Sequence, residues 1–171
     1  MLTIRPEHPL DYSAIFGVNN LAFGKENEPR LVEILRQSPG FNPELSLVAE
    51  LENQVVGHIL FSPVVIETST GEIPILALAP MAVRPEFQNQ GIGSELVRQG
   101  LEACRRLGYR IVVVLGHSSF YPRFGFESAR PKGISAPFLV SDENWMVIEL
   151  HSGALSNIQG TVRYPPAFDD V

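Results

Sequence analysis

The sequence has a single cysteine, Cys104, and no long apolar run. One cysteine excludes an intrachain disulfide and a zinc site built from several cysteines. The longest uncharged apolar run, Ile73–Val83, has 11 residues and two prolines, whereas a membrane-spanning helix needs ~20 apolar residues. The segment Met1–Leu10 also lacks the apolar stretch of a signal peptide. We therefore expect a protein of the reducing cytoplasm that has no membrane partner.

Basic residues are also scarce. The chain has 13 Lys and Arg residues against 19 Asp and Glu, which gives a net charge of −6. General binding to nucleic acid requires a basic surface, so nucleic acid is not an expected partner. The charge does not exclude one local site for an anion. The length of 171 residues predicts one domain over 1–171, with 155–171 as a C-terminal tail.

Hydrophobic spacing, caps and turn residues predict the order β-α-α-β-β-β-α-β-α-β-β, a mixed α/β (α+β) fold. The expected strands are Leu2–Arg5, Leu45–Leu51, Val55–Glu67, Glu72–Val83, Arg110–Leu115, Phe126–Ala129 and Asn144–His151. The expected helices run from Asp11 to Gly24, over Glu28–Gln37 and over Gly91–Leu107, with a helical turn at Ser119–Phe124. We expect Gly160–Val171 to be a proline-containing tail.

Two positions in this pattern have a specific meaning. Pro80 lies in an otherwise apolar strand, where it cannot donate to a sheet ladder, so it marks a bulge or a place where pairing stops. Gly100 lies on the apolar face of the helix over Gly91–Leu107 and would let that helix approach a sheet closely.

The segment after Val83 predicts a site for an anion. A strand ends there, a short loop follows, and a helix begins at Gly91 and Gly93. The first N–H groups of a helix have no partners within it and carry partial positive charge, so a phosphate can bind there without lysine. A P-loop is excluded because no lysine follows Gly93, and a Rossmann fingerprint is disfavoured because Leu96 occupies its third glycine position.

The remaining pattern, Q-x-x-G-x-G at Gln88–Gly93, resembles the motif of the GCN5-related N-acetyltransferases, the GNAT superfamily. A second motif, Phe120–Phe126, is similar to the Y-x-x-x-G-F segment of that family. Two motifs in the family's order are more specific than either one alone. Gly116-His117 and Gly160–Phe168 also resemble the YhbS-like group of predicted acetyltransferases.

The resemblance implies an N-acetyltransferase that moves an acetyl group from acetyl-CoA to an amine by direct attack in a ternary complex, without a metal. It implies a sheet splayed between the strands that end at Val83 and Leu115, with the pantetheine arm on the backbone of Met81 and Val83. Tyr121 matches the family's general acid. The cofactor-binding residues that it implies are Met81, Ala82, Val83, Gln88, Asn89, Gln90, Gly91, Ile92, Gly93, Ser94 and Phe124.

The general base is left open. Many relatives use a Glu in the strand before the pyrophosphate loop, but Leu76–Val83 has no acidic residue. The asparagine that often follows the family's central strand is also absent, because Gly116 to Ser118 occupy those positions. Glu26, Glu28, His117, Glu143 and water are the candidates for the base.

Other interpretations of single residues and of the whole chain are left open. Cys104 lies on an apolar helix face, where an inert core thiol is the default, and His58 is expected to be a strand histidine with a hydrogen-bond partner. A non-catalytic acyl-CoA-binding or sensing module, and an oxidoreductase or nucleotide-binding protein with the same glycine loop, are the rival functions. The expected acceptor is an amine of a small molecule or a protein. The length of the acyl group that CoA carries, acetyl or longer, is left open. The family often forms dimers, so a homodimer is an expected alternative to a monomer.

Overall fold

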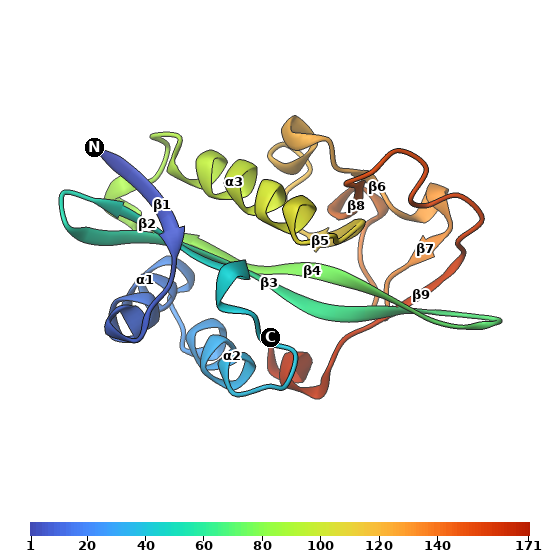
Figure 1. The fold of residues 1–171 in the computed structure, drawn as a ribbon, viewed down its shortest axis with the longest axis horizontal. Coiled ribbons are helices and arrows are strands. Elements are labelled where there is room, and N and C mark those ends of the chain that lie inside the picture. Colours follow the sequence, from blue (N-terminus) through green and yellow to red (C-terminus); the bar gives the residue numbers. More distant parts are fainter. The chain divides into compact units, whose positions relative to one another are not determined.

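The computed structural model describes all residues from 1 to 171 (Figure 1). Contacts divide the chain into two compact units. Unit 1 comprises 1–62, 79–103 and 166–171, and unit 2 comprises 63–78 and 104–165. The long hairpin of strands β3 and β4 contributes residues to both units. The single domain expected from the length stays a prediction.

The structure contains helices and strands in the mixture that the sequence predicts. The helices are α1 (Tyr12–Phe23), α2 (Asn27–Arg36) and α3 (Ile92–Arg106). The strands are β1 (Leu2–Pro6), β2 (Ser46–Leu51), β3 (Gln54–Thr68), β4 (Gly71–Val83), β5 (Ile111–Leu115), β6 (Glu127–Ser128), β7 (Ile134–Ser135), β8 (Trp145–Glu149) and β9 (Gly160–Arg163). Both parallel and antiparallel pairs occur, so the predicted mixed α+β class is confirmed. No helix has both the length and the apolar composition to span a membrane.

In unit 1, α1 and α2 cover one face of the sheet. Successive strand residues point to opposite faces, and β3 shows this directly because His58 contacts α1 whereas a Cβ on Gly57 would meet Leu96 of α3. The apolar cluster on the α1 and α2 side comprises Ile15, Val18, Leu31, Val32, Leu35, Val48, Val55, Leu60 and Ala82.

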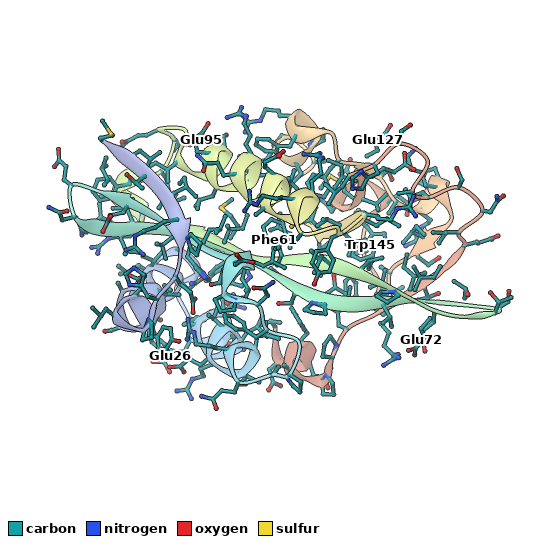
Figure 2. All side chains as sticks on the ribbon, in the orientation of Figure 1. Glu26, Phe61, Glu72, Glu95, Glu127 and Trp145 are labelled. Atoms are coloured by element: carbon teal, nitrogen blue, oxygen red, sulfur yellow. The ribbon has the colours of Figure 1, made fainter.

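Helix α3 approaches β3 very closely. A Cβ on Gly100 would lie 2.4 Å from the ring of Phe61 (labelled in Figure 2). No larger side chain fits at that distance, so glycine at this position is a packing requirement. The close approach expected from the sequence is confirmed.

In unit 2, β5 is the centre of the pairing. It runs parallel to β4, with Leu76 opposite Val112 and Ala77 opposite Val113, and antiparallel to β8 along its whole length. The apolar cluster around it comprises Val64, Ile66, Ile75, Ala77, Ile111, Val113, Ala129, Ile134, Trp145, Val147, Ala154 and Val162. Both residues of β4 that pair with β5 precede Pro80, in keeping with the pairing stop expected there.

The C-terminal segment is a correction to the sequence prediction. Gly160–Val171 is not a plain tail, because β9 pairs with β3 in unit 2, with Val65 opposite Arg163. In unit 1, a 3-10 helix at Pro166–Asp170 follows, and its Phe168 packs against the cluster under α1 and α2. The local sequence of this segment does not indicate the sheet edge that it pairs with.

Candidate active site

The end of β4 presents alternating backbone groups to its two sides. The amide of Arg84 donates to the carbonyl oxygen of Val56 in β3 at 2.8 Å. Neighbouring residues of a strand direct their N–H groups to opposite edges. The amides of Val83 and Met81 therefore point away from β3, while Ala82 places its side chain in the core cluster of unit 1. This is the backbone edge on which the family resemblance places the pantetheine arm.

One side chain bridges the turn after Val83. Gln88 Nε2 donates to the carbonyl oxygen of Val83 at 3.0 Å. Asn89 and Gly91 then adopt positive φ angles of 64° and 86°, a region that favours glycine. The four residues from Gln88 to Gly91 are exposed, and no atom lies within 4 Å of a Cβ built on Gly91. An anion can therefore reach the first N–H groups of α3.

The remaining residues predicted for the cofactor are distributed between the two units. Ile92, Gly93 and Ser94 form the first turn of α3 in unit 1, where Ile92 is buried and the other two are partly exposed. Phe124 belongs to unit 2, in a 3-10 helix at Tyr121–Phe124, and its ring lies 5.1 Å from that of Phe120. The role of each residue in binding stays a prediction.

Tyr121 is buried in an aromatic cluster of unit 2. Its ring makes edge contacts with Phe120 at 5.0 Å and with Phe126 at 5.6 Å between centroids. Burial disfavours the phenolate and raises the pKa of Tyr121 to about 12. The phenol therefore keeps its proton across the physiological range, as a proton donor must.

Comparison with known proteins decides the family. A family model described as an acetyltransferase (GNAT) domain matches residues 42–128, which is half of the chain. The chain belongs to the GNAT acetyltransferase family. The predicted resemblance to the superfamily is thereby confirmed.

Two relatives come from Escherichia coli K12, and both are described as uncharacterized N-acetyltransferases. YjhQ is 41% identical over 144 residues, which cover 82% of this chain and 80% of that protein. YhbS is 34% identical over 169 residues, which cover 98% of this chain and 99% of that protein. The resemblance to the YhbS-like group extends over nearly the whole chain.

Two solved structures share the fold. The structure of YhbS from Escherichia coli in complex with CoA matches with a TM-score of 0.89 and 33% identity, over 98% of this chain and 91% of that one. A GNAT family acetyltransferase from Brucella melitensis in complex with acetyl-CoA matches with a TM-score of 0.81 and 34% identity, over 99% of each chain.

The candidate bases in this GNAT chain differ in what their side chains contact. Glu26, on the outer surface between α1 and α2 (Figure 2), forms an ion pair with Arg30. Glu28 is mostly buried, and its Oε1 has no hydrogen-bond partner. In unit 2, His117 and Glu143 are exposed. Glu28 is therefore the one candidate with a buried carboxylate oxygen that nothing in the chain satisfies.

Two residues behave as their sequence positions predict. Cys104 is fully buried, and burial raises the pKa of its thiol to about 12, so a thiolate is strongly disfavoured. His58 is fully buried and lies 2.9 Å from Ser46 Oγ through Nε2 and 3.2 Å from Asn19 Nδ2 through Nδ1. Both are confirmed as core residues.

Sequence reasoning missed the chain of polar groups to which His58 belongs. Asn19 Nδ2 donates to the Ile15 carbonyl oxygen and to His58 Nδ1, which places the imidazole proton on Nε2. That proton is donated to Ser46, whose hydroxyl donates to the Glu7 carboxylate. Asn19, His58, Ser46 and Glu7 are far apart in the sequence, so no local motif could have indicated this chain.

Proposed function

We propose that this GNAT chain transfers an acetyl group from acetyl-CoA to an amine acceptor, by direct attack within a ternary complex. The observation that carries the proposal is the exposed turn from Gln88 to Gly91, between the free edge of β4 and the start of α3. Its backbone N–H groups suit a pyrophosphate, and the edge of β4 suits the amides of a pantetheine arm. Acetyl-CoA has both groups.

Each proposed residue then has a defined task. The N–H groups of Met81 and Val83 bind the pantetheine arm as an added strand would, and one near Met81 polarises the thioester carbonyl. The backbone from Gln88 to Ser94 binds the pyrophosphate, with Gln88 itself bonded to Val83 so that the turn keeps its shape. Acetyl-CoA supplies the acetyl group as an activated thioester.

The reaction needs one proton donor and one proton acceptor. Tyr121 donates a proton to the leaving thiolate, because a phenol carries its proton at neutral pH. The acceptor must lose a proton before attack, and Glu28, Glu26, His117, Glu143 or a water accepts it. Cys104 is excluded as an acyl carrier by its burial and raised thiol pKa, which favours direct transfer.

The net charge of the chain supports a cationic acceptor. A net charge of −6 attracts cationic acceptors by electrostatic steering. We propose a primary amine, carried by a small molecule or a protein, in the cytoplasm where acetyl-CoA is available.

The test is a screen of amine acceptors that follows release of free thiol from acetyl-CoA. We expect thiol release that depends on both the enzyme and one class of amine. Acetyl-CoA binding without turnover of any amine would support the non-catalytic sensing module instead. Calorimetry with acetyl-CoA, NAD and ATP completes the test, since tight binding of NAD or ATP without binding of acetyl-CoA would overturn the proposal.

A further inference from the structure

The β5–β8 ladder of unit 2 ends on an unusual pair. The register places Leu115 opposite Trp145, so Gly116 and Asn144 form the next pair. The Gly116 amide donates to the Asn144 carbonyl oxygen at 3.0 Å. In an antiparallel ladder, the reciprocal bond would come from the Asn144 amide. That amide instead donates to the Ser141 carbonyl oxygen at 3.0 Å.

The Asn144 side chain supplies the missing bond. Its Nδ2 donates to the Gly116 carbonyl oxygen at 2.9 Å. The last rung of the ladder is therefore made by one backbone bond and one side-chain bond, and both hold Gly116 in place. Alanine or aspartate at position 144 could not donate the second bond.

Gly116 in turn forms a wall of the Tyr121 site. A Cβ built on Gly116 would lie 2.3 Å from Tyr121 Cε2 and 2.8 Å from Cδ2. The amides of Phe120 and Tyr121 both approach the His117 carbonyl oxygen, at 3.1 and 3.4 Å, which turns the chain back on itself. The tyrosine ring thus packs directly on the glycine backbone. A shift of Gly116 would therefore shift the position of the ring.

We propose that Asn144 is a positioning residue for Tyr121, acting through Gly116. It completes the β5–β8 ladder with its side chain and so fixes the backbone against which the tyrosine ring packs. The role of Asn144 in catalysis rests on the proposed function of Tyr121 as the general acid. Asn144 touches no reactant.

The kinetic test is a double-mutant cycle with thiol release as the readout. Asn144→Ala and Asn144→Asp should each lower kcat about tenfold or more, since small misplacements of catalytic groups have large effects on rate, while KM for acetyl-CoA stays unchanged. In the Tyr121→Phe background, Asn144→Ala should lower kcat no further. An equal loss in both backgrounds, or no loss in either, would overturn the proposal.

A second measurement does not depend on activity. With tyrosine labelled by 13C in the ring, the Tyr121 signals are assigned by their loss in Tyr121→Phe. Asn144→Ala should shift or broaden those signals and leave those of Tyr12, in unit 1, unchanged. Unchanged Tyr121 signals would overturn the proposal. If the ring signals move but Tyr121→Phe retains full activity, the general-acid assignment fails while the link from Asn144 to Tyr121 holds.

Glycine substitutions provide the matched control. Gly116→Ala should displace the Tyr121 ring and lower kcat with Asn144 intact, because the new Cβ has no room. Gly17→Ala adds the same methyl group where no atom lies within 4 Å, so it should leave kcat unchanged. Full activity of Gly116→Ala would show that the ring position does not depend on Gly116 and would overturn the proposal.

Discussion

The two compact units differ in what their cores contain. The buried polar and charged residues of the chain all belong to unit 1, and they are Glu7, Asp11, Asn19, Ser46, His58 and Ser62. The core cluster of unit 2 is apolar and is packed around Trp145. The first core depends on matched hydrogen bonds, since a buried polar group without a partner destabilises the fold. The second depends mainly on burial and shape, and its Trp145 Nε1 donates to the Ile134 carbonyl oxygen at 3.1 Å.

The two cores also differ in how they respond to low and high pH. In unit 1, bonds from Arg5 hold the pKa of Asp11 below its usual value, and burial lowers the pKa of His58 to about 3. In unit 2, burial raises the pKa values of Cys104, Tyr121 and Tyr164. Acid therefore acts against unit 1 and strong alkali against unit 2, which makes pH a way to address each core separately.

The largest effect is expected from the ion pair in the core of unit 1. Glu7 accepts two bonds from Arg36, at 2.8 and 3.0 Å, and one from Ser46. Glu7→Gln leaves a buried guanidinium without its carboxylate, and we expect the free energy of unfolding to fall by about 3–5 kcal/mol. Chemical denaturation measures this, with the exposed Glu33→Gln as the control, expected within ~0.5 kcal/mol of the wild type. A loss below that of the control would contradict the polar-core account of unit 1.

The next effect concerns the aromatic site of unit 2. Tyr121→Phe keeps the ring packing and removes the proton donor, so kcat should fall about 100-fold or more, while the calorimetric Kd for acetyl-CoA stays the same. In the wild type, the pKa of about 12 should keep kcat from declining through this group until the pH is well above 10. Acetyl transfer at the wild-type rate in Tyr121→Phe would remove Tyr121 from the chemistry.

Acid should distinguish the cores by a graded effect that is small for each pH unit. The folded-state pKa of His58 is about 3, below its ordinary 6.5, so the unfolded chain binds a proton that the folded chain excludes. The contribution of His58 to the free energy of unfolding is therefore complete above pH 6.5. It falls as the pH drops toward 3, by up to about 1.4 kcal/mol per pH unit. In denaturation experiments at several pH values, His58→Gln should make the free energy of unfolding fall less steeply between pH 6.5 and 3. His151→Gln, at an exposed site, should leave that slope unchanged. The same slope in both variants would mean that groups other than His58 cause the loss of stability in acid.

The smallest effect compares two glycines with left-handed backbones. Gly91 in unit 1 and Gly108 in unit 2 have φ angles of 86° and 90°, and a Cβ on either meets nothing within 4 Å. Alanine at either position should lower the free energy of unfolding by about 1 kcal/mol through backbone strain. Calorimetry should show weaker acetyl-CoA binding for Gly91→Ala alone. Equal Kd values for both variants would mean that the turn does not bind the pyrophosphate.

Local features of the fold could be predicted from the sequence because their causes are local. The turn with Gly91, the helix that follows it and the contact face with Gly100 all depend on residues within a few positions of one another. Positive φ favours glycine, and apolar residues at helical spacing define one face. The motif residues could be named for the same reason, although their roles stay predictions.

Features formed by distant residues could not be predicted. Asn144 bonds Gly116 across 28 positions, and Ser46 joins Glu7 to His58 across 39 and 12 positions. Strand β9 was missed because its pattern does not identify the edge of β3 that it pairs with. In each case, the partner depends on strand register, which a period-two pattern leaves undefined until the strands pair.

The sequence by itself determined the mixed fold, the family motifs and the exclusion of an intrachain disulfide, since composition and spacing act before the chain folds. Tertiary structure alone decided which buried polar groups satisfy one another, that the Gly116 backbone holds the Tyr121 ring, and that the final residues pack on unit 1. The physical reason is that a hydrogen bond or a close contact is specified by two positions in space. Those positions are set only when the packing of the strands fixes their register.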